Sequence, residues 1–383
     1  MPKLLVPTIS ERLAQTLCIN YVSRMNTILL ILPMIAVLAA TPSLSSAWGP
    51  EGHEIVGVVA QHHLRSSHAK QKILEILGDE TLKEASTWPD AVKHRHNPRN
   101  LPEALRDDQD SIDFVIAAAP GKPNADNERW HFANLPLGAP DYQSVFSSYP
   151  ELPSPDNPFT SPRDIVHVIN VCIQRLHGHS VSGYELSEKN ALRFLVHLLG
   201  DIHQPLHIAS GYFAASPASP SDLLIGDPKT IADGHLKGDR GGNSLFYQEQ
   251  PAEELHAHWD GDLVKYAIRT APHGVRHNVD DYAAYLATLK PESGWKPTGD
   301  ITKWAEQVAN ESLANAKTAY AAVTPTDIKV HHYTVSTGHG STPVDGYPIQ
   351  LTTHYDADDA PMVQIQLAKA GYRLAKILDA IWP

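Results

Sequence analysis

The residues of this chain that can do chemistry are histidines and aspartates spaced four apart inside apolar segments. His197 and Asp201 form one such pair, in a run of mostly apolar residues that continues to Leu206. On a helix, residues four apart project from the same face, one turn above the other. Imidazole nitrogen and carboxylate oxygen are both good zinc ligands. Because a buried charge needs a partner, we interpret the pair as part of a metal site rather than as core residues satisfied by backbone carbonyls.

Two further histidines follow in the same segment. His203 and His207 repeat the spacing of four, rotated by roughly a third of a turn if the helix continues at about 3.6 residues per turn. Pro205 interrupts the pattern and is expected to kink or end the helix. One segment can therefore serve two adjacent metal positions.

A second pair with the same spacing is His256 and Asp260. On a helix these two residues again share a face. Two such pairs in one helical domain indicate a site with several metal ions more strongly than either pair alone.

Two aromatic motifs lie between the N-terminus and the first pair. In Trp88-Pro89-Asp90, proline in a first turn suits a helix start, so Asp90 is either a helix cap or a metal ligand. In Trp130-His131-Phe132, the phenylalanine beside a candidate ligand is either a platform on which a base stacks or part of the core.

A glycine-rich turn, Gly238 to Asn243, precedes the second pair. Glycines let a backbone come close to a ligand. Asn243 is the candidate residue for hydrogen bonding to that ligand. Such a turn is weak evidence when it stands alone.

The N-terminal sequence has the features of a targeting segment. Arg24 precedes an almost wholly apolar stretch, residues 25–40, and a small-x-Ala cleavage site ends at Ala47. Translation can also begin at Met25. The alternative is a membrane anchor, but about sixteen apolar residues containing proline are short for a span. We therefore predict a signal peptide over residues 1–47 and a mature protein, 48–383, that is secreted or periplasmic.

Cleavage after Ala47 would make Trp48 the first residue of the mature protein. A free amine on Trp48, together with its carbonyl oxygen, can chelate a metal ion in a five-membered ring. His53 is close enough in sequence to add a third ligand from the first turn of the helix predicted to begin near Glu51.

Composition limits the classes of protein that remain. The chain has 383 residues, a formal charge of −12, 22 histidines and only two cysteines. A net acidic protein is a poor candidate for holding nucleic acid on a broad basic surface, so a phosphate substrate needs local cations. Removal of residues 1–47 leaves Cys172 alone, so the core and bound metal must stabilise the fold without an internal disulfide.

Hydrophobic periodicity predicts several helices after residue 48, with no internal repeat and no convincing second domain. Residues 210–233 are expected to form an exposed insertion, and residues 323–358 a hairpin or a loop. Helices are predicted from near Glu51 and over residues 67–77, 162–176, 185–206, 298–322 and 359–381.

These motifs, in this order, resemble the zinc-dependent single-strand nucleases and 3′-nucleotidases of fungi, plants and bacteria, the S1/P1 nuclease family. The resemblance covers about residues 48–380. It implies an all-α, mainly helical single domain over residues 48–383, of the zinc phospholipase C and S1/P1 nuclease type, with three zinc ions at the base of a cleft. The motifs are Trp48…His53, Trp88-Pro89-Asp90, Trp130-His131-Phe132, His197-x-x-x-Asp201, Gln204-Pro205-Leu206-His207, Asp239-Arg240-Gly241-Gly242-Asn243 and His256-x-x-x-Asp260.

The resemblance also implies roles for individual residues, with Asp90 and Asp201 in the catalytic centre and Asp201 bridging two metals. His203 is implied to lie outside the metal ligands, as a support for them. The first zinc is implied to bind Asp90, His131, His197 and Asp201, the second His207, His256 and Asp260, and the third Trp48, His53 and Asp201.

Phe132, Asn134 and Asn243 match family positions that contact a base, although the fungal enzymes have an aspartate where this chain has Asn134. The implied activity is hydrolysis of single-stranded DNA and RNA to 5′-phosphate products, with 3′-nucleotidase activity, by a monomer without stable membrane association. Two other classes remain open: a zinc-dependent phospholipase C, and a zinc-storage protein that shows no turnover.

Overall fold

The computed structural model describes residues 48–149, 159–249, 251–337 and 340–383. The predicted signal peptide, residues 1–47, lies outside the described residues, and every element below belongs to the unit Pro42–Pro383. No helix within the described ranges has both the length and the apolar character needed to cross a bilayer.

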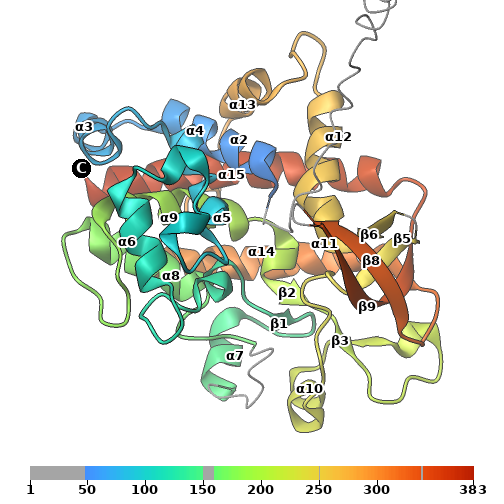
Figure 1. The fold of residues 1–383 in the computed structure, drawn as a ribbon. Helices are drawn as coiled ribbons and strands as arrows, with labels where there is room; N and C mark the ends of the chain where they lie inside the picture. Colours follow the sequence, from blue (N-terminus) through green and yellow to red (C-terminus); the bar gives the residue numbers. More distant parts are fainter. Residues whose placement is uncertain (1–47, 150–158, 250, 338–339) are drawn as a thin grey trace, which may run out of the picture. The chain divides into compact units, whose positions relative to one another are not determined.

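The fold is mainly helical, as the sequence predicts (Figure 1). The helices are α2 (Pro50–His63), α3 (Ser67–Leu77), α4 (Leu82–Ala85), α5 (Trp88–Val92), α6 (Gln109–Ala117), α7 (Tyr142–Ser148), α8 (Ile165–Leu176), α9 (Glu188–Asp201), α10 (Pro228–Gly234), α11 (Leu255–Ala257), α12 (Leu263–Arg269), α13 (Val279–Ala287), α14 (Trp304–Ala321) and α15 (Tyr355–Ile381). Short 3-10 turns are η1 (Pro98–Asn100), η2 (Glu103–Leu105), η3 (Asn127–His131), η4 (Pro205–His207), η5 (Pro220–Asp222) and η7 (Ile301–Lys303), and η6 (His258–Asp262) is a π-helix.

Helix α9 is the central element, and its residues from Asn190 to Asp201 are all buried. Ser187 caps it by accepting a hydrogen bond from the backbone N–H of Asn190. A helix that is buried on every side must neutralise any charge it carries. Arg193 meets this condition because it contacts Glu80 and Asp108, each at 2.7 Å.

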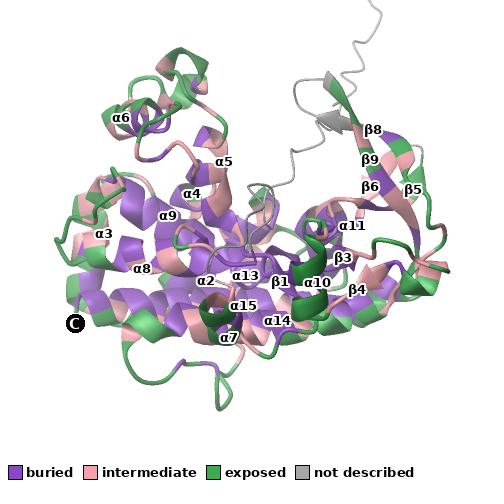
Figure 2. Cartoon of the chain, turned by 90° about the horizontal axis from the view of Figure 1, so that it is seen from below, coloured by how far each residue is buried: buried purple, intermediate pink, exposed green. Residues whose placement is uncertain are grey.

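The other long helices pack around α9. Helix α2 contacts both α15 and α9, while α8 lies against α9 and α14. Gly371 permits the close approach of α15 to α2, since a Cβ atom there would come within 2.5 Å of the Val59 Cβ. Figure 2 shows the buried residues concentrated in these helices, with α10 largely exposed.

The end of α9 differs from the sequence prediction. The sequence predicts a helix over 185–206, but α9 ends at Asp201, and the following backbone N–H groups bond three residues back, as from Gln204 to Asp201. Pro205 then begins η4, which agrees with its expected role as a terminator. The prediction that His203 and His207 repeat the helical spacing is therefore wrong, because the two lie in different turns.

The strands form small sheets rather than a second layer. They are β1 (Leu135–Pro136), β2 (Ala209–Ser210), β3 (Tyr212–Phe213), β4 (Leu224–Ile225), β5 (Leu245–Glu249), β6 (Ala252–Glu254), β7 (Val323–Pro325), β8 (His331–Thr337) and β9 (Gly340–Leu351).

Residues 323–358, for which a hairpin or a loop is expected, contain an antiparallel β8–β9 hairpin, and β9 also pairs with β5 and β7. Residues 210–233 are less exposed than expected. Tyr212 and Leu223 are buried, because the β3–β4 pair carries them against the rest of the fold.

Candidate metal centre

Three groups of histidine and aspartate side chains converge at the C-terminal end of α9. In each group the possible ligand atoms lie within 4.8 Å of one another. All eight side chains that the sequence predicts as ligands, apart from the terminal Trp48, take part. The groups are His53, His197 and Asp201; Asp90, His131 and His197; and His207, His256 and Asp260.

Asp201 stands between two of these groups. Its Oδ1 lies 3.2 Å from Nε2 of His53, and its Oδ2 lies 3.0 Å from Nδ1 of His131 and 3.2 Å from Nε2 of His197. All four side chains have no exposed surface. Each carboxylate oxygen therefore faces a different set of rings, as a bridging ligand requires.

His197 is held in one orientation by the backbone. Its Nδ1 lies 2.7 Å from the carbonyl oxygen of Ser86 and can only donate there, so the lone pair is on Nε2. That lone pair faces Nδ1 of His131 at 3.0 Å and Oδ1 of Asp90 at 3.7 Å. Burial lowers the pKa of His197, but the Asp201 and Asp90 carboxylates outweigh it and raise the pKa above its ordinary value. The position therefore attracts positive charge.

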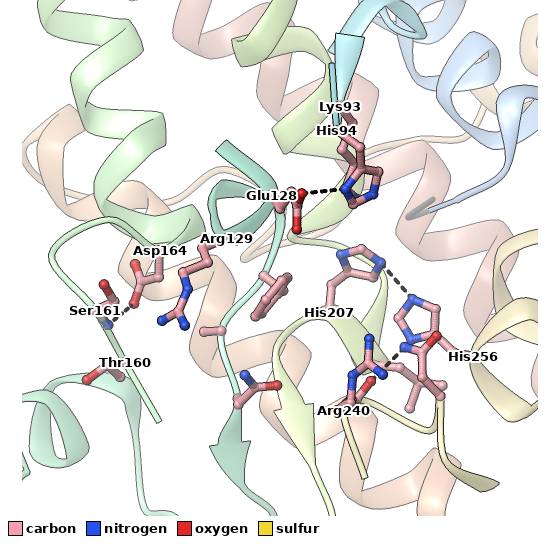
Figure 3. Close-up of a pocket in the computed structure, with 15 residues that line it drawn as sticks. Lys93, His94, Glu128, Arg129, Thr160, Ser161, Asp164, His207, Arg240 and His256 are labelled. Carbon is pink, nitrogen blue, oxygen red and sulfur yellow. Dashed lines mark hydrogen bonds and ion pairs between the residues drawn. The ribbon is translucent and has the colours of Figure 1, made fainter. Parts of the chain in front are cut away.

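Backbone carbonyls also orient the rings of His207 and His256. Each Nδ1 lies 2.7 Å from a backbone carbonyl oxygen, of His131 and of Gly241 respectively, so both lone pairs are on Nε2. The two Nε2 atoms face each other at 3.0 Å (Figure 3). Burial lowers the pKa of His207 to about 4 and that of His256 well below its usual value, so both rings are neutral at pH 7. Two facing lone pairs repel unless a cation lies between them.

Asp260 completes this group, with Oδ2 at 3.4 Å from Nε2 of His256. Its other oxygen accepts a hydrogen bond from Nε2 of Gln204 at 2.8 Å. The sequence predicts one helical face for His256 and Asp260, and the two do lie together, with His256 in α11 and Asp260 in the π-helix η6 that follows it. Such turns occur frequently at functional sites.

The residues fit a metal ion by a second criterion, which is unpaired buried polar atoms. Buried polar atoms in proteins are nearly always hydrogen-bonded, so a concentration of unpaired ones marks a place for a ligand. The unpaired atoms here are both ring nitrogens of His53, Nε2 of His131, Oδ1 of Asp90, Oδ1 of Asp201 and Oδ2 of Asp260. Nitrogen and carboxylate oxygen are the donor atoms that zinc prefers.

The segment that begins at Trp48 is packed into this centre. Trp48 is fully buried, and the N–H of Gly49 donates to the carbonyl oxygen of Asp260. Gly200 leaves room for the His53 ring, because a Cβ there would lie 2.8 Å from its Nδ1. The contacts bring Trp48 to the ligand groups, and its own role as a ligand stays a prediction.

A cleft of about 520 Å³ lies beside the centre, with His207 and His256 in its wall. Phe132, Asn134 and Asn243, which the resemblance implies as base-contacting residues, all line it. Three cationic side chains, to which the sequence motifs assign no role, also line this cleft: Lys93, Arg129 and Arg240. The one signal for Lys93 is its position one helical turn after Asp90.

Arg240 begins a left-handed turn. Arg240, Gly241 and Gly242 have φ values of 62°, 64° and 88°, and a Cβ on Gly241 would overlap the carbonyl oxygen of Leu206. The expectation that this turn brings backbone close to a bound ligand stays a prediction. In the structure the carbonyl oxygen of Gly241 accepts a hydrogen bond from Nδ1 of His256 and so orients that ring.

Buried Asp239 fixes this turn. The Tyr320 hydroxyl donates to its Oδ2 at 2.8 Å, and the N–H of Gly242 donates to its Oδ1 at 3.1 Å. Burial raises the pKa of Asp239 to about 7. The sequence gives no indication of this support, because Tyr320 is 81 residues away in α14.

The fold and the site define a mainly helical protein whose candidate metal ligands are gathered at one helix end. Comparison with known proteins gives the family. The family model for S1/P1 nuclease matches residues 48–383, and the chain belongs to that family. It is therefore a nuclease, a hydrolase that acts on ester bonds, and its family is zinc-dependent.

Similarity extends over nearly the whole length of curated relatives. The chain is 25% identical to Nuclease S1 of Aspergillus oryzae, over 92% of this chain and 97% of that protein. It is 23% identical to Endonuclease 3 of Arabidopsis thaliana (91% and 94%) and 26% identical to Nuclease PA3 of a Penicillium species (87% and 97%).

Replacing Asp201 and His203 in turn should distinguish a residue that binds metal from one that only stabilises the surrounding fold. His203 turns away from the metal groups: its Nε2 lies 2.8 Å from Nη1 of Arg373, and its Nδ1 donates to the carbonyl oxygen of Leu199. We expect Asp201→Asn to lower the zinc content and abolish activity. His203→Ala should retain zinc and lose about 1–3 kcal/mol of stability, from an unpaired buried donor. Elemental analysis and urea unfolding measure both, and equal zinc losses would contradict the assignment.

Proposed function

We propose that the protein is a zinc-dependent endonuclease that hydrolyses single-stranded DNA and RNA to 5′-phosphate products and also acts as a 3′-nucleotidase. The observation that carries this proposal is the set of unpaired ring nitrogens and carboxylate oxygens beside a cleft lined by Phe132, Asn134 and Asn243. The names of the relatives, nuclease and endonuclease, agree with it.

We infer three zinc ions. The overlap of two of the three groups at His197, and the two-sided position of Asp201, support a cluster with one bridging carboxylate. The proposed ligand sets are Asp90, His131, His197 and Asp201; His207, His256 and Asp260; and the amine and carbonyl of Trp48 with His53 and Asp201.

Bound zinc supplies Lewis acidity and lowers the pKa of the water that attacks phosphorus. The chain's own residues hold the ions and supply charge for the phosphate. Burial opposes ionisation of Asp90, but His197 and Lys93 outweigh it and lower the pKa of Asp90, so this carboxylate is ionised at neutral pH and can bind a cation. Lys93, with Nζ 4.0 Å from Oδ1 of Asp90, carries a positive charge for the phosphate.

The cleft favours single strands. Phe132 is partly exposed in its wall and can stack on one base, while Asn134 and Asn243 can bond to that base. A base in a duplex is already stacked and paired, so the duplex must lose that energy before a base can enter.

A phospholipase C is the nearest rival. A lipid substrate calls for large apolar side chains exposed around the cleft. The large hydrophobic residues that are well exposed in the described ranges are Leu74, Ile116, Ile328 and Val330, and none of them lines the cleft. This favours the nuclease.

Residues 1–47 are proposed as a signal peptide, with Met25 as a possible start, and residues 48–383 as the nuclease domain. The family match begins at Trp48, the residue that comes directly after the proposed cleavage site. The protein is then secreted or periplasmic, and we propose that it acts as a monomer.

The zinc content of the mature protein tests the metal proposal. We expect about three zinc ions per chain, since eight side chains and the Trp48 terminus would offer three sets of nitrogen and oxygen donors, the donor types that suit zinc. Elemental analysis of active, dialysed protein gives the number. A value of one or less in fully active protein would exclude the cluster.

The activity is tested with four substrates: single-stranded DNA, single-stranded RNA, a 3′-mononucleotide and phosphatidylcholine, each with and without a chelator. We expect turnover of the first three, loss of turnover with chelator, and recovery on addition of zinc. Turnover of phosphatidylcholine alone would support the phospholipase instead. Zinc binding without turnover of any substrate would support a storage protein.

The role of Trp48 is tested through its α-amine. An amide nitrogen is a very poor zinc ligand, so protein with residues attached before Trp48 should fold but contain about one zinc fewer and lose most phosphodiesterase activity. Proteolysis that exposes Trp48 should restore both. The control carries the same extra residues after Pro383, where both should be normal. If the N-terminally extended form is as active as the cleaved form, the terminal chelate is wrong.

A further inference from the structure

We propose that Ser210 orients the side-chain amide of Asn134 so that the cleft presents one hydrogen-bond donor and one acceptor to a base, and that this polarity sets the base preference. The inference rests on the proposed nuclease function and concerns selectivity among the four bases.

A directed chain of hydrogen bonds ends at Asn134. The N–H of Gly241 donates to Oγ of Ser210 at 2.9 Å, and the Ser210 hydroxyl lies 3.0 Å from Oδ1 of Asn134. Ser210 is fully buried. Among the described residues its proton has no other acceptor within hydrogen-bond distance, so a reversed amide would leave a buried hydroxyl proton unpaired, which is unfavourable. The geometry therefore assigns Oδ1 to Ser210.

The remaining polar groups of Asn134 are also engaged. Its backbone N–H donates to the carbonyl oxygen of Phe159 at 3.0 Å, and its carbonyl oxygen accepts from the Tyr212 hydroxyl at 2.7 Å. Asn134 is only 6% exposed, yet it lines the cleft. The Nδ2 group is what remains to face the cleft, and it can only donate.

Asn243 supplies the opposite polarity. Its Nδ2 donates to the carbonyl oxygen of Arg240 at 2.7 Å, a contact that the amide oxygen could not make because two acceptors repel. The Oδ1 of Asn243 is therefore the group available to accept in the cleft, which Asn243 also lines.

A donor and an acceptor suit every base. The Watson–Crick edges of adenine, cytosine, guanine and uracil each place a donor next to an acceptor, while only guanine places two donors side by side. The side chains of Asn134 and Asn243 can therefore form hydrogen bonds with the Watson–Crick edge of any of the four bases. A carboxylate at position 134 would keep the bond from Ser210 and present a second acceptor instead of a donor, which favours guanine.

The test compares kcat/KM for the four 3′-mononucleotides with the zinc-loaded mature protein. The wild type should vary by less than about tenfold among bases, and Asn134→Asp should raise the ratio of guanine to the other bases by about tenfold. A general effect of negative charge on phosphate binding affects all four substrates alike and cancels in the ratio. Asn97→Asp, a change of the same charge at an exposed helix cap outside the cleft, should leave the ratio unchanged.

Ser210→Ala tests the positioning role. Without the hydroxyl the amide can turn its oxygen toward the cleft, so the guanine ratio should rise in the same direction by a smaller factor. A uniform loss for all four bases would mean that Ser210 only stabilises the fold, and it would overturn the positioning role. The melting temperature reports that loss separately.

Dissociation constants of the four nucleosides, measured by calorimetry, give the same ratios without turnover. If no protein turns over any nucleotide, the proposed function fails, and these constants still test the polarity. An unchanged guanine ratio in both Asn134→Asp and Ser210→Ala, by either measurement, would overturn the inference.

Discussion

The structure depends on a small set of buried ring nitrogens whose lone pairs are forced toward one another. Backbone carbonyls of Ser86, His131 and Gly241 each accept an Nδ1 proton and so fix a neighbouring histidine with Nε2 pointing inward. At 3.0 Å between Nε2 of His207 and Nε2 of His256 there is no proton to share at neutral pH. Only a cation relieves this repulsion. The facing lone pairs therefore destabilise the metal-free fold, and metal binding would offset that destabilisation.

Helix α9 can carry such an arrangement because other elements hold its end. The Ser312 hydroxyl of α14 donates to the carbonyl oxygen of Ile202, immediately after Asp201. Arg373 of α15 contacts His203 and also Glu311, whose pKa it holds at about 2 against the effect of burial. The segment that follows Asp201 is therefore held by two long helices, α14 and α15. This explains why a domain without a disulfide can keep its ligands in register.

The ligands were predictable from sequence where spacing and chemistry coincide. Local helix geometry is enough to predict that His197 and Asp201 lie on one face. Pro205 likewise indicates that the helix ends before it. The path of the chain beyond Pro205 depends on tertiary contacts, so the helical pairing of His203 with His207 was wrong. The place of Lys93 and Arg240 in the cleft was not predicted, because a single cation in a sequence carries no sign that it will line a cleft, even where a motif contains it, as with Arg240. The support from Tyr320 to Asp239 is a contact between distant elements, which no local pattern encodes.

An acidic chain can still bind a polyanion, because charge matters locally. At physiological ionic strength a surface carboxylate more than about 8 Å from the phosphate is largely screened. The formal charge of −12 belongs to the whole chain, whereas the cleft lining contains the carboxylates Glu128 and Asp164 beside the cations Lys93, Arg129 and Arg240. Within the centre, Asp201 and Asp260 are buried and Asp90 is partly buried, beside histidines that cannot balance their charges alone. Metal ions that neutralise these carboxylates would reverse the sign of the field at the cleft, so one feature both completes the buried ligand sets and attracts the phosphate.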